Sequence, residues 1–245
     1  MSTLEERIRS VQERIRTAAE NCGRSADGIT LVAATKVQTS DTIREAIRDG
    51  IRVCGENRVQ ELMDHWEDGT YDGAELHFIG RLQTNKVKYI VGKVSLIHSV
   101  DSVKLLEEIG KRAGKLGIIQ DILLEVNIGR EESKGGFLPE ELPVAVGKAR
   151  EAEGVRLRGL MAIPPVSTAP GGNCGFFAEM KRLFVDIRTQ INDNEGNIDC
   201  LSMGMSGDFE DAIRAGATMV RVGTALFGPR PPRKDGPDTA KTNER

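Results

Sequence analysis

The sequence predicts a single (β/α)₈ barrel of the TIM type with one extra helix at its N-terminus. Two observations carry this prediction: short β-branched runs alternate with helical patterns along the chain, and eight such runs can be counted. Alternation of this kind implies parallel strands that are joined by right-handed crossovers. The length of 245 residues matches the roughly 250 residues that one such barrel uses. An open, doubly wound sheet is the alternative.

The predicted elements follow one another in a regular order. The extra helix is predicted at 3–22, where apolar residues recur at steps of three and four. The strands are predicted at 29–34, 51–54, 75–79, 94–98, 119–126, 155–163, 198–202 and 218–222. The clearest helical patterns between them lie at 40–49, 102–116 and 177–191. Residues 1–228 therefore form the predicted domain, and 229–245, which are polar and rich in Pro, are predicted to be a disordered tail.

Composition and charge exclude several classes of protein. The net charge of −3 argues against a general nucleic-acid binder, which is usually basic. No run of about 18 apolar residues occurs, so we expect no membrane span. The N-terminus has no apolar signal core, which predicts a cytoplasmic protein. The four cysteines form no C-x-x-C pair and the three histidines have no metal-binding spacing, so we expect reduced thiols and no metal site.

A lysine closes the first predicted strand. Lys36 follows an apolar run, and barrel active sites lie at the C-terminal ends of the strands. Burial and neighbouring cations lower the pKa of a lysine, and the neutral amine can then form a Schiff base. The alternative is a lysine whose stem lies along the strand end and whose ammonium group reaches water. The first strand alone does not decide between the two.

The loops after strands seven and eight have the composition of a phosphate site. Such sites in barrels are commonly built from these two loops together with a helix N-terminus. The first loop contains Ser206, and the second contains Gly223 and Thr224. They offer hydroxyl groups and a close approach of the backbone to a ligand. Residues 206–208 also have the pattern of a helix N-cap, which is compatible with anion binding.

Two more polar residues are expected near the barrel mouth. Arg221 lies within strand eight, where alternation directs it inward, toward a pyridine nitrogen or a carboxylate. Its alternative role is an ion pair with a neighbouring acid. Asn57 follows strand two, where it either caps the next helix or contacts a ligand. A lysine amine opposite a phosphate site is what pyridoxal 5′-phosphate (PLP) requires, and a lysine-dependent aldolase for phosphorylated sugars requires the same pair.

Several long blocks of the sequence carry a family resemblance from the first helix to about Gly228. They are 31–36, 55–61, 77–80 with 82–83 and 85–86, 159–161, 201–206 with Asp208, and 220–228. In content and order these blocks resemble the pyridoxal phosphate homeostasis protein family, also called the YggS-like or proline synthetase co-transcribed family. The resemblance is specific, because it rests on long blocks rather than on one short glycine motif.

The resemblance implies a barrel like the N-terminal domain of alanine racemase, and a set of cofactor-binding residues. These residues are Lys36, Asn57, Ser206, Arg221, Gly223 and Thr224. In that set the lysine holds PLP as a Schiff base, the arginine faces the pyridine nitrogen, and the serine, glycine and threonine hold the phosphate. The asparagine lines the pocket. Family members are described as binding and buffering PLP in vitamin B6 homeostasis, and as passing it to apoenzymes, without catalysis.

The resemblance therefore implies a non-catalytic protein of intracellular PLP homeostasis. Its expected partners are PLP and apo PLP-dependent enzymes, with no nucleic acid and no membrane, and we expect a monomer. Two positions need attention: Gln38 replaces a second lysine that some members carry, and Lys134, in a Ser-Lys-x-Gly block, is an alternative acceptor of the cofactor.

The alternative function is that of a PLP-dependent, racemase-like enzyme. Racemases of this fold take a catalytic tyrosine from a C-terminal β-domain. Here the predicted barrel is followed by a polar tail, and Tyr71 and Tyr89 lie in its first half. These features favour the carrier.

Overall fold

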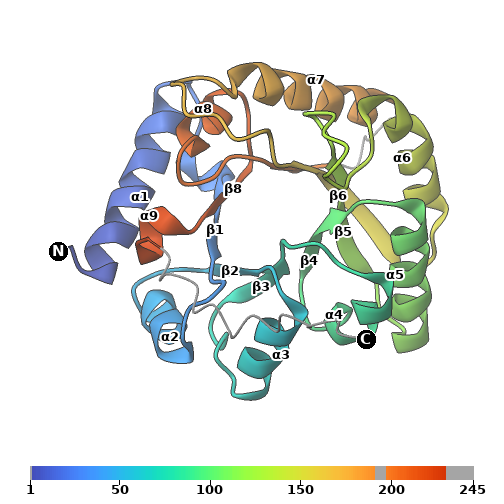
Figure 1. The fold of residues 1–245 in the computed structure, drawn as a ribbon, viewed down its shortest axis with the longest axis horizontal. Coiled ribbons are helices and arrows are strands. Elements are labelled where there is room, and N and C mark those ends of the chain that lie inside the picture. The colour runs from blue at the N-terminus through green and yellow to red at the C-terminus, as the bar shows by residue number, and fades with distance from the viewer. Residues whose placement is uncertain (1, 191–196, 230–245) are drawn as a thin grey trace, which may run out of the picture.

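The computed structural model describes residues 2–190 and 197–229, and within them eight parallel strands close into a barrel (Figure 1). The strands are β1 Thr30–Ala34, β2 Val53–Glu56, β3 Glu75–Phe78, β4 Leu96–Val100, β5 Gln120–Val126, β6 Val155–Ala162, β7 Cys200–Ser202 and β8 Met219–Val222. Their order around the barrel follows the chain, and β1 pairs with β8 at Val32 and Arg221. This closure confirms the predicted barrel and excludes the open sheet.

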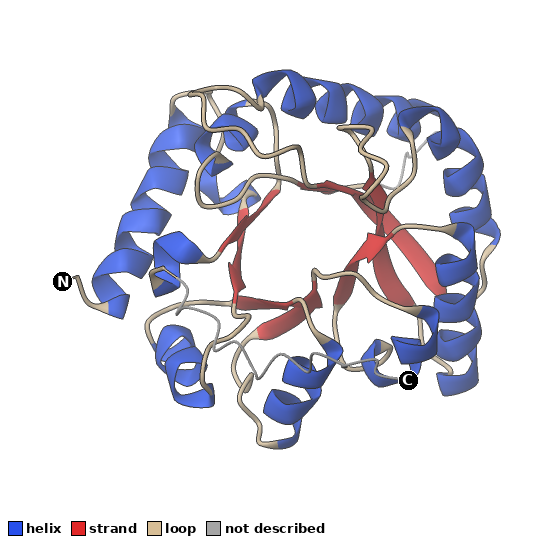
Figure 2. Cartoon of the chain, in the orientation of Figure 1, coloured by secondary structure: helices blue, strands red, loops and turns tan. Residues whose placement is uncertain are grey.

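Helices surround the strands on the outside of the barrel (Figure 2). They are α1 Leu4–Glu20, α2 Ser40–Arg48, α3 Val59–Glu67, α4 Val87–Ile90, α5 Val103–Leu116, α6 Leu142–Glu151, α7 Cys174–Gln190, α8 Phe209–Arg214 and α9 Thr224–Phe227, with short 3₁₀ turns at Ala26–Gly28, Thr84–Lys86 and Pro139–Glu141. The extra helix α1 begins at a capping box in which Thr3 and Glu6 bond to each other's backbone N–H groups. It packs on α8 and α9, where Arg14 pairs with Glu210 at 2.8 Å.

The predicted strand positions agree with the structure to within two residues. The largest shifts are at β2, β4 and β7, which begin two residues later than predicted. The cause is visible in the packing, because Ile51, Val94 and Ile198 are buried although they precede their strands. A buried apolar residue that lies just before a strand therefore has the same sequence signal as a strand residue. Beyond Pro229 the predicted tail lies outside the described residues.

Apolar side chains pack in two separate layers. The larger layer lies between the strands and the helices, and it contains, for example, Cys54, Phe78 and Ile97. The smaller layer is inside the barrel and is formed by Leu96, Leu123, Met161 and Cys200. Because side chains alternate along a strand, the neighbours of outer-layer residues face the barrel interior. His77, His98, Ser202 and Arg221 occupy such interior positions and are buried.

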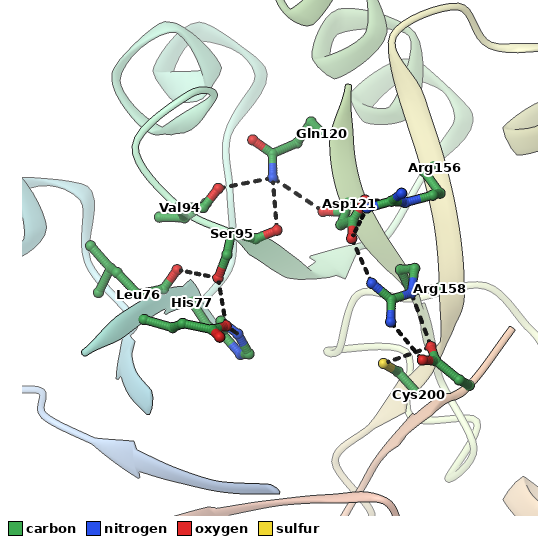
Figure 3. A network of polar contacts seen from close by, with 11 residues as sticks. Leu76, His77, Val94, Ser95, Gln120, Asp121, Arg156, Arg158 and Cys200 are labelled. Atoms are coloured by element: carbon green, nitrogen blue, oxygen red, sulfur yellow. Dashed lines mark hydrogen bonds and ion pairs between the residues drawn. The ribbon is translucent and has the colours of Figure 1, made fainter. Parts of the chain in front are cut away.

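Polar contacts hold the opposite, N-terminal end of the strands (Figure 3). Arg156 and Arg158 both donate to the carboxylate of Asp121, at 2.6 Å and 2.7 Å. Arg158 also donates to Asp199, which directly precedes β7, at 2.6 Å. The guanidinium of Arg158 and the carboxylates of Asp121 and Asp199 therefore join β5, β6 and β7 at the end of the barrel that is remote from the predicted site.

Two features of the described residues concern the chain as a whole. None of the four cysteines takes part in a disulfide. Among the helices of residues 2–190 and 197–229, none combines the length and the apolar character that crossing a membrane requires.

Candidate functional site

A cavity of about 600 Å³ opens at the C-terminal ends of the strands. All of the residues predicted to bind the cofactor line it, namely Lys36, Asn57, Ser206, Arg221, Gly223 and Thr224. They come from the ends of β1, β2, β7 and β8, so segments that are far apart in the sequence meet in one place. That these residues bind PLP stays a prediction at this point.

The turn after β1 directs Lys36 into the cavity. The N–H of Gln38 donates to the carbonyl of Thr35 at 3.0 Å, so Lys36 lies at the second position of a four-residue turn. Val37 follows with a φ of 60°, in the left-handed region that a β-branched residue rarely adopts. Such a conformation costs on the order of 1–3 kcal/mol and persists only when the surroundings enforce it. The backbone beside the half-buried lysine is therefore held under strain.

Two acids hold the neighbours of Lys36 on either side. The hydroxyl of Thr35 donates to Glu56 at 2.5 Å, and the N–H of Val37 donates to Glu61 at 3.0 Å. Glu56 is fully buried at the end of β2, and burial raises the pKa of its carboxyl to about 7. We did not predict either role from the sequence, although an acid that ends a buried strand is an unusual signal. The block at 55–61 therefore positions the lysine.

Arg221 is buried at the bottom of the cavity. Its guanidinium donates to the hydroxyl of Ser202 at 2.6 Å and to the carbonyl of Ala162 at 2.8 Å. Burial lowers the pKa of Arg221 to about 10, which still leaves it charged near neutral pH. Both hydrogen-bond partners are neutral, and no ion pair of Arg221 is found among the described residues, although the charges of Glu125 and Asp208 act on it. The arginine keeps its charge and some of its donors for a ligand.

A chain of polar side chains continues from Arg221 into the barrel. Ser202 Oγ lies 2.9 Å from His98 Nδ1, and His98 Nε2 lies 3.0 Å from His77 Nδ1. Burial lowers the pKa of His77 to about 4 and holds the pKa of His98 well below its ordinary value. Both rings are therefore neutral near neutral pH. No sequence pattern indicates this contact, because it joins residues that are distant in the chain.

The loops after β7 and β8 are joined by the hydroxyl of Ser206. Its oxygen accepts the backbone N–H groups of Gly223 and Ala225, both at 3.2 Å. The proton of this hydroxyl has no acceptor among the described residues, so it is available to a ligand. Asp208 is the N-cap residue of α8, but its side chain does not cap the helix and instead accepts the N–H of Met205 at 2.7 Å. The predicted N-cap position within 206–208 is therefore confirmed at Asp208, although no side chain there caps the helix, and Ser206 lines the cavity.

Asn57 lines the cavity and does not cap a helix. The N-cap of α3 is Arg58, so the capping alternative for Asn57 is wrong. The Oδ1 atom of Asn57 is buried without a hydrogen-bond partner. The backbone there lies close to Gly80, where a Cβ would come within 2.1 Å of the Asn57 carbonyl oxygen, so any side chain at 80 would displace it. A buried acceptor without a donor fits a cavity that holds a polar ligand.

Glu125, Asp101 and Lys134 line the same cavity. Burial, followed by the charge of Asp101, raises the pKa of Glu125. Lys134 forms an ion pair with Glu131 and lies 3.5 Å from the carbonyl of Pro164. Lys134 is therefore within the cavity, as an alternative acceptor of the cofactor must be, but its ammonium group is engaged in an ion pair.

Comparison with known sequences identifies the family. Residues 7–231 match the family described as alanine racemase, N-terminal domain. The pyridoxal phosphate homeostasis protein of Aquifex aeolicus is 47% identical over 225 residues, which are 92% of this chain and 97% of the relative. The protein of the same name from Escherichia coli K12 is 37% identical over 94% of this chain and 98% of the relative.

Solved structures agree with the sequence relatives. PipY of Synechococcus elongatus, solved with PLP bound, has a TM-score of 0.80 and 31% identity, and the match covers 92% of this chain and all of PipY. An alanine racemase from Clostridium difficile shares the fold with a TM-score of 0.68 at 14% identity, and this chain spans 56% of its length. With the sequence relatives, these findings confirm the resemblance to the family. The chain belongs to the pyridoxal phosphate homeostasis protein family, which is built on the barrel of the alanine racemase N-terminal domain.

Proposed function

We propose that this protein binds PLP in the cavity at the C-terminal end of the barrel, holds it as a Schiff base on Lys36, and serves PLP homeostasis. The observation that carries the proposal is that one cavity combines a lysine, a buried guanidinium and a pair of loops with free hydrogen-bonding capacity. Support comes from PipY, a 31% identical structure that contains PLP. Relatives named for PLP homeostasis support the physiological role.

Each part of the cavity has a distinct task toward the cofactor. PLP supplies an aldehyde, which condenses reversibly with a primary amine, and the aldehyde oxygen leaves as water. Ser206, Thr224 and the backbone around Gly223 would hold the phosphate, since hydroxyl and N–H donors suit a dianion. Arg221 would donate to the pyridine nitrogen, and the unpartnered Oδ1 of Asn57 would accept from the ligand. The strained turn keeps Lys36 directed at the site.

The arrangement favours a carrier over a racemase. Racemisation needs a second proton donor on the far face of the substrate, and the racemase-like alternative assigns that task to a tyrosine. Neither tyrosine of this chain lines the cavity. Tyr71 is buried in the outer layer and donates to Glu56 at 3.1 Å. We propose that the protein acts without catalysis, as a cytoplasmic monomer that passes PLP to apo PLP-dependent enzymes.

The proposal is tested by adding PLP to the wild type and to Lys36→Ala. We expect visible absorbance of a Schiff base in the wild type and its loss in the variant. Absorbance that is unchanged in Lys36→Ala would place the covalent bond elsewhere. Interconversion of L- and D-alanine should stay at background, and a turnover of ~1–10³ s⁻¹, which is ordinary for an enzyme, would contradict the carrier.

A further inference from the structure

We propose that Ser202, His98 and His77 are positioning residues that hold Arg221 as a donor toward the pyridine nitrogen of PLP. With Arg221 they form a hydrogen-bond chain of one polarity, in which each group donates to the next. The proposal rests on the proposed function, because it assigns a task to residues behind the cofactor site. The chain crosses the barrel interior, from the cavity to the network at the N-terminal end that Figure 3 shows. Of the four residues in this hydrogen-bond chain, only Arg221 lines the cavity.

The polarity follows from the one member that can only donate. A guanidinium has no acceptor, so Ser202 Oγ accepts from Arg221 at 2.6 Å. The proton of the serine hydroxyl is then left for His98 Nδ1, at 2.9 Å. A neutral imidazole has one N–H group, so His98 carries its proton on Nε2 and donates it to His77 Nδ1 at 3.0 Å. His77 in turn carries its proton on Nε2, which lies 3.6 Å from the carboxylate of Glu75.

The opposite polarity is disfavoured by burial. If His98 donated from Nδ1, Ser202 Oγ would accept from two donors and its own proton would need a third partner. Within the described residues the hydroxyl has only Arg221 and His98. A buried hydroxyl proton without an acceptor costs about 1–3 kcal/mol. Ser202 and His98 are completely buried, so water does not replace the missing partner at the surface.

The chain has a consequence for the cofactor. Arg221 has five N–H donors, and the hydroxyl of Ser202 and the carbonyl of Ala162 take two of them in a fixed orientation. Because both partners are neutral, they orient the guanidinium without neutralising its charge. A fixed cation facing the pyridine nitrogen keeps that nitrogen unprotonated, and an unprotonated ring withdraws electrons weakly. The hydrogen-bond chain therefore fixes the direction in which Arg221 presents its remaining donors to the cofactor.

The test compares substitutions within the hydrogen-bond chain with a buried substitution outside it. Ser202→Ala and His98→Leu interrupt the chain, whereas His98→Gln keeps one acceptor and one donor. Cys200→Ala is the matched control, because Cys200 faces the barrel interior on the same strand, and its thiol donates to Asp199 instead of joining the hydrogen-bond chain. We expect Ser202→Ala and His98→Leu to weaken PLP binding about tenfold and to shift the absorbance of bound PLP. His98→Gln and Cys200→Ala should remain close to the wild type.

A second measurement uses the ligand-free wild type, and thus stands even if a variant fails to fold. Nitrogen NMR of the histidine rings should show His98 and His77 both protonated on Nε2. A proton on Nδ1 of either ring would overturn the proposal, and so would Ser202→Ala binding PLP with the affinity and absorbance of Cys200→Ala. If the wild type itself bound no PLP, the proposed function would fail, and with it the task assigned to the chain. The ring tautomers would still decide the polarity.

Discussion

The hydroxyl of Ser206 offers the sharpest test of how the ligand is held. Its oxygen accepts two backbone N–H groups of the loop after β8, from Gly223 and Ala225. The proton of the Ser206 hydroxyl remains available to a ligand in the cavity. Ser206→Ala therefore removes one donor to the phosphate and releases two N–H groups that the serine had engaged. We expect the variant to bind PLP more weakly while the barrel remains folded.

The size of the effect follows from these contacts. A hydrogen bond to a charged group contributes about 1.5–3 kcal/mol, which corresponds to roughly 10- to 100-fold in affinity. The two released N–H groups compensate in part, because they can turn toward the phosphate. We therefore expect a loss near the lower limit, about tenfold. Unphosphorylated pyridoxal has no phosphate to lose, so its weaker binding should hardly change.

The assay is a titration of both vitamers against wild type and Ser206→Ala, followed by visible absorbance. Ser133→Ala is the matched control, because Ser133 lines the same cavity from the loop after β5. It should bind both vitamers as the wild type does. An equal loss for PLP and pyridoxal in Ser206→Ala, or no loss for either, would show that the phosphate is not held by the loops after β7 and β8.

Three further predictions concern stability. Val37→Gly should raise the free energy of unfolding by about 1 kcal/mol, because glycine adopts the left-handed conformation without strain, and a loss measured by urea unfolding would refute this. The raised pKa of Glu56 means that the folded state holds a proton which the unfolded state releases between pH 4.5 and about 7. Stability should thus fall on the order of 3 kcal/mol across that window in the wild type but not in Glu56→Gln, and equal pH profiles would contradict the burial cost. Arg158→Ala should lower the free energy of unfolding by about 1–3 kcal/mol, measured by thermal melts, without affecting PLP affinity. The control Arg182→Ala, on the surface of α7, should lower it by less than ~1 kcal/mol in the same measurement.

The sequence was sufficient for the fold because its signals are local. Each strand is marked by its own β-branched run, and the predicted starts of β2, β4 and β7 are too early only because a buried residue before each strand continues the apolar pattern. The predicted site residues likewise follow from position, since every one of them lies at or just after the end of a strand. Closure of the barrel then brings these strand ends together around one cavity, so the site needs no sequence signal beyond the strands themselves.

The supporting contacts could not be predicted because they are not local. Val37 and Glu61 are 24 residues apart, and His98 and Ser202 are 104 apart. The spacing of the histidines predicts no metal site, and the structure uses one pair as neutral hydrogen-bonding groups inside the barrel. Spacing along the chain carries no information about a contact across the barrel axis. Alternation places such residues inside, but only the register of the strands pairs them.

The identity of the covalent residue is tested most directly by trapping the bond. PLP-loaded protein is reduced with borohydride, digested and mapped by mass spectrometry. We expect one pyridoxyl phosphate group, on the peptide that contains Lys36. A label on Lys134 instead, or a label spread over surface lysines, would contradict the assignment of Lys36 as the residue that holds the cofactor.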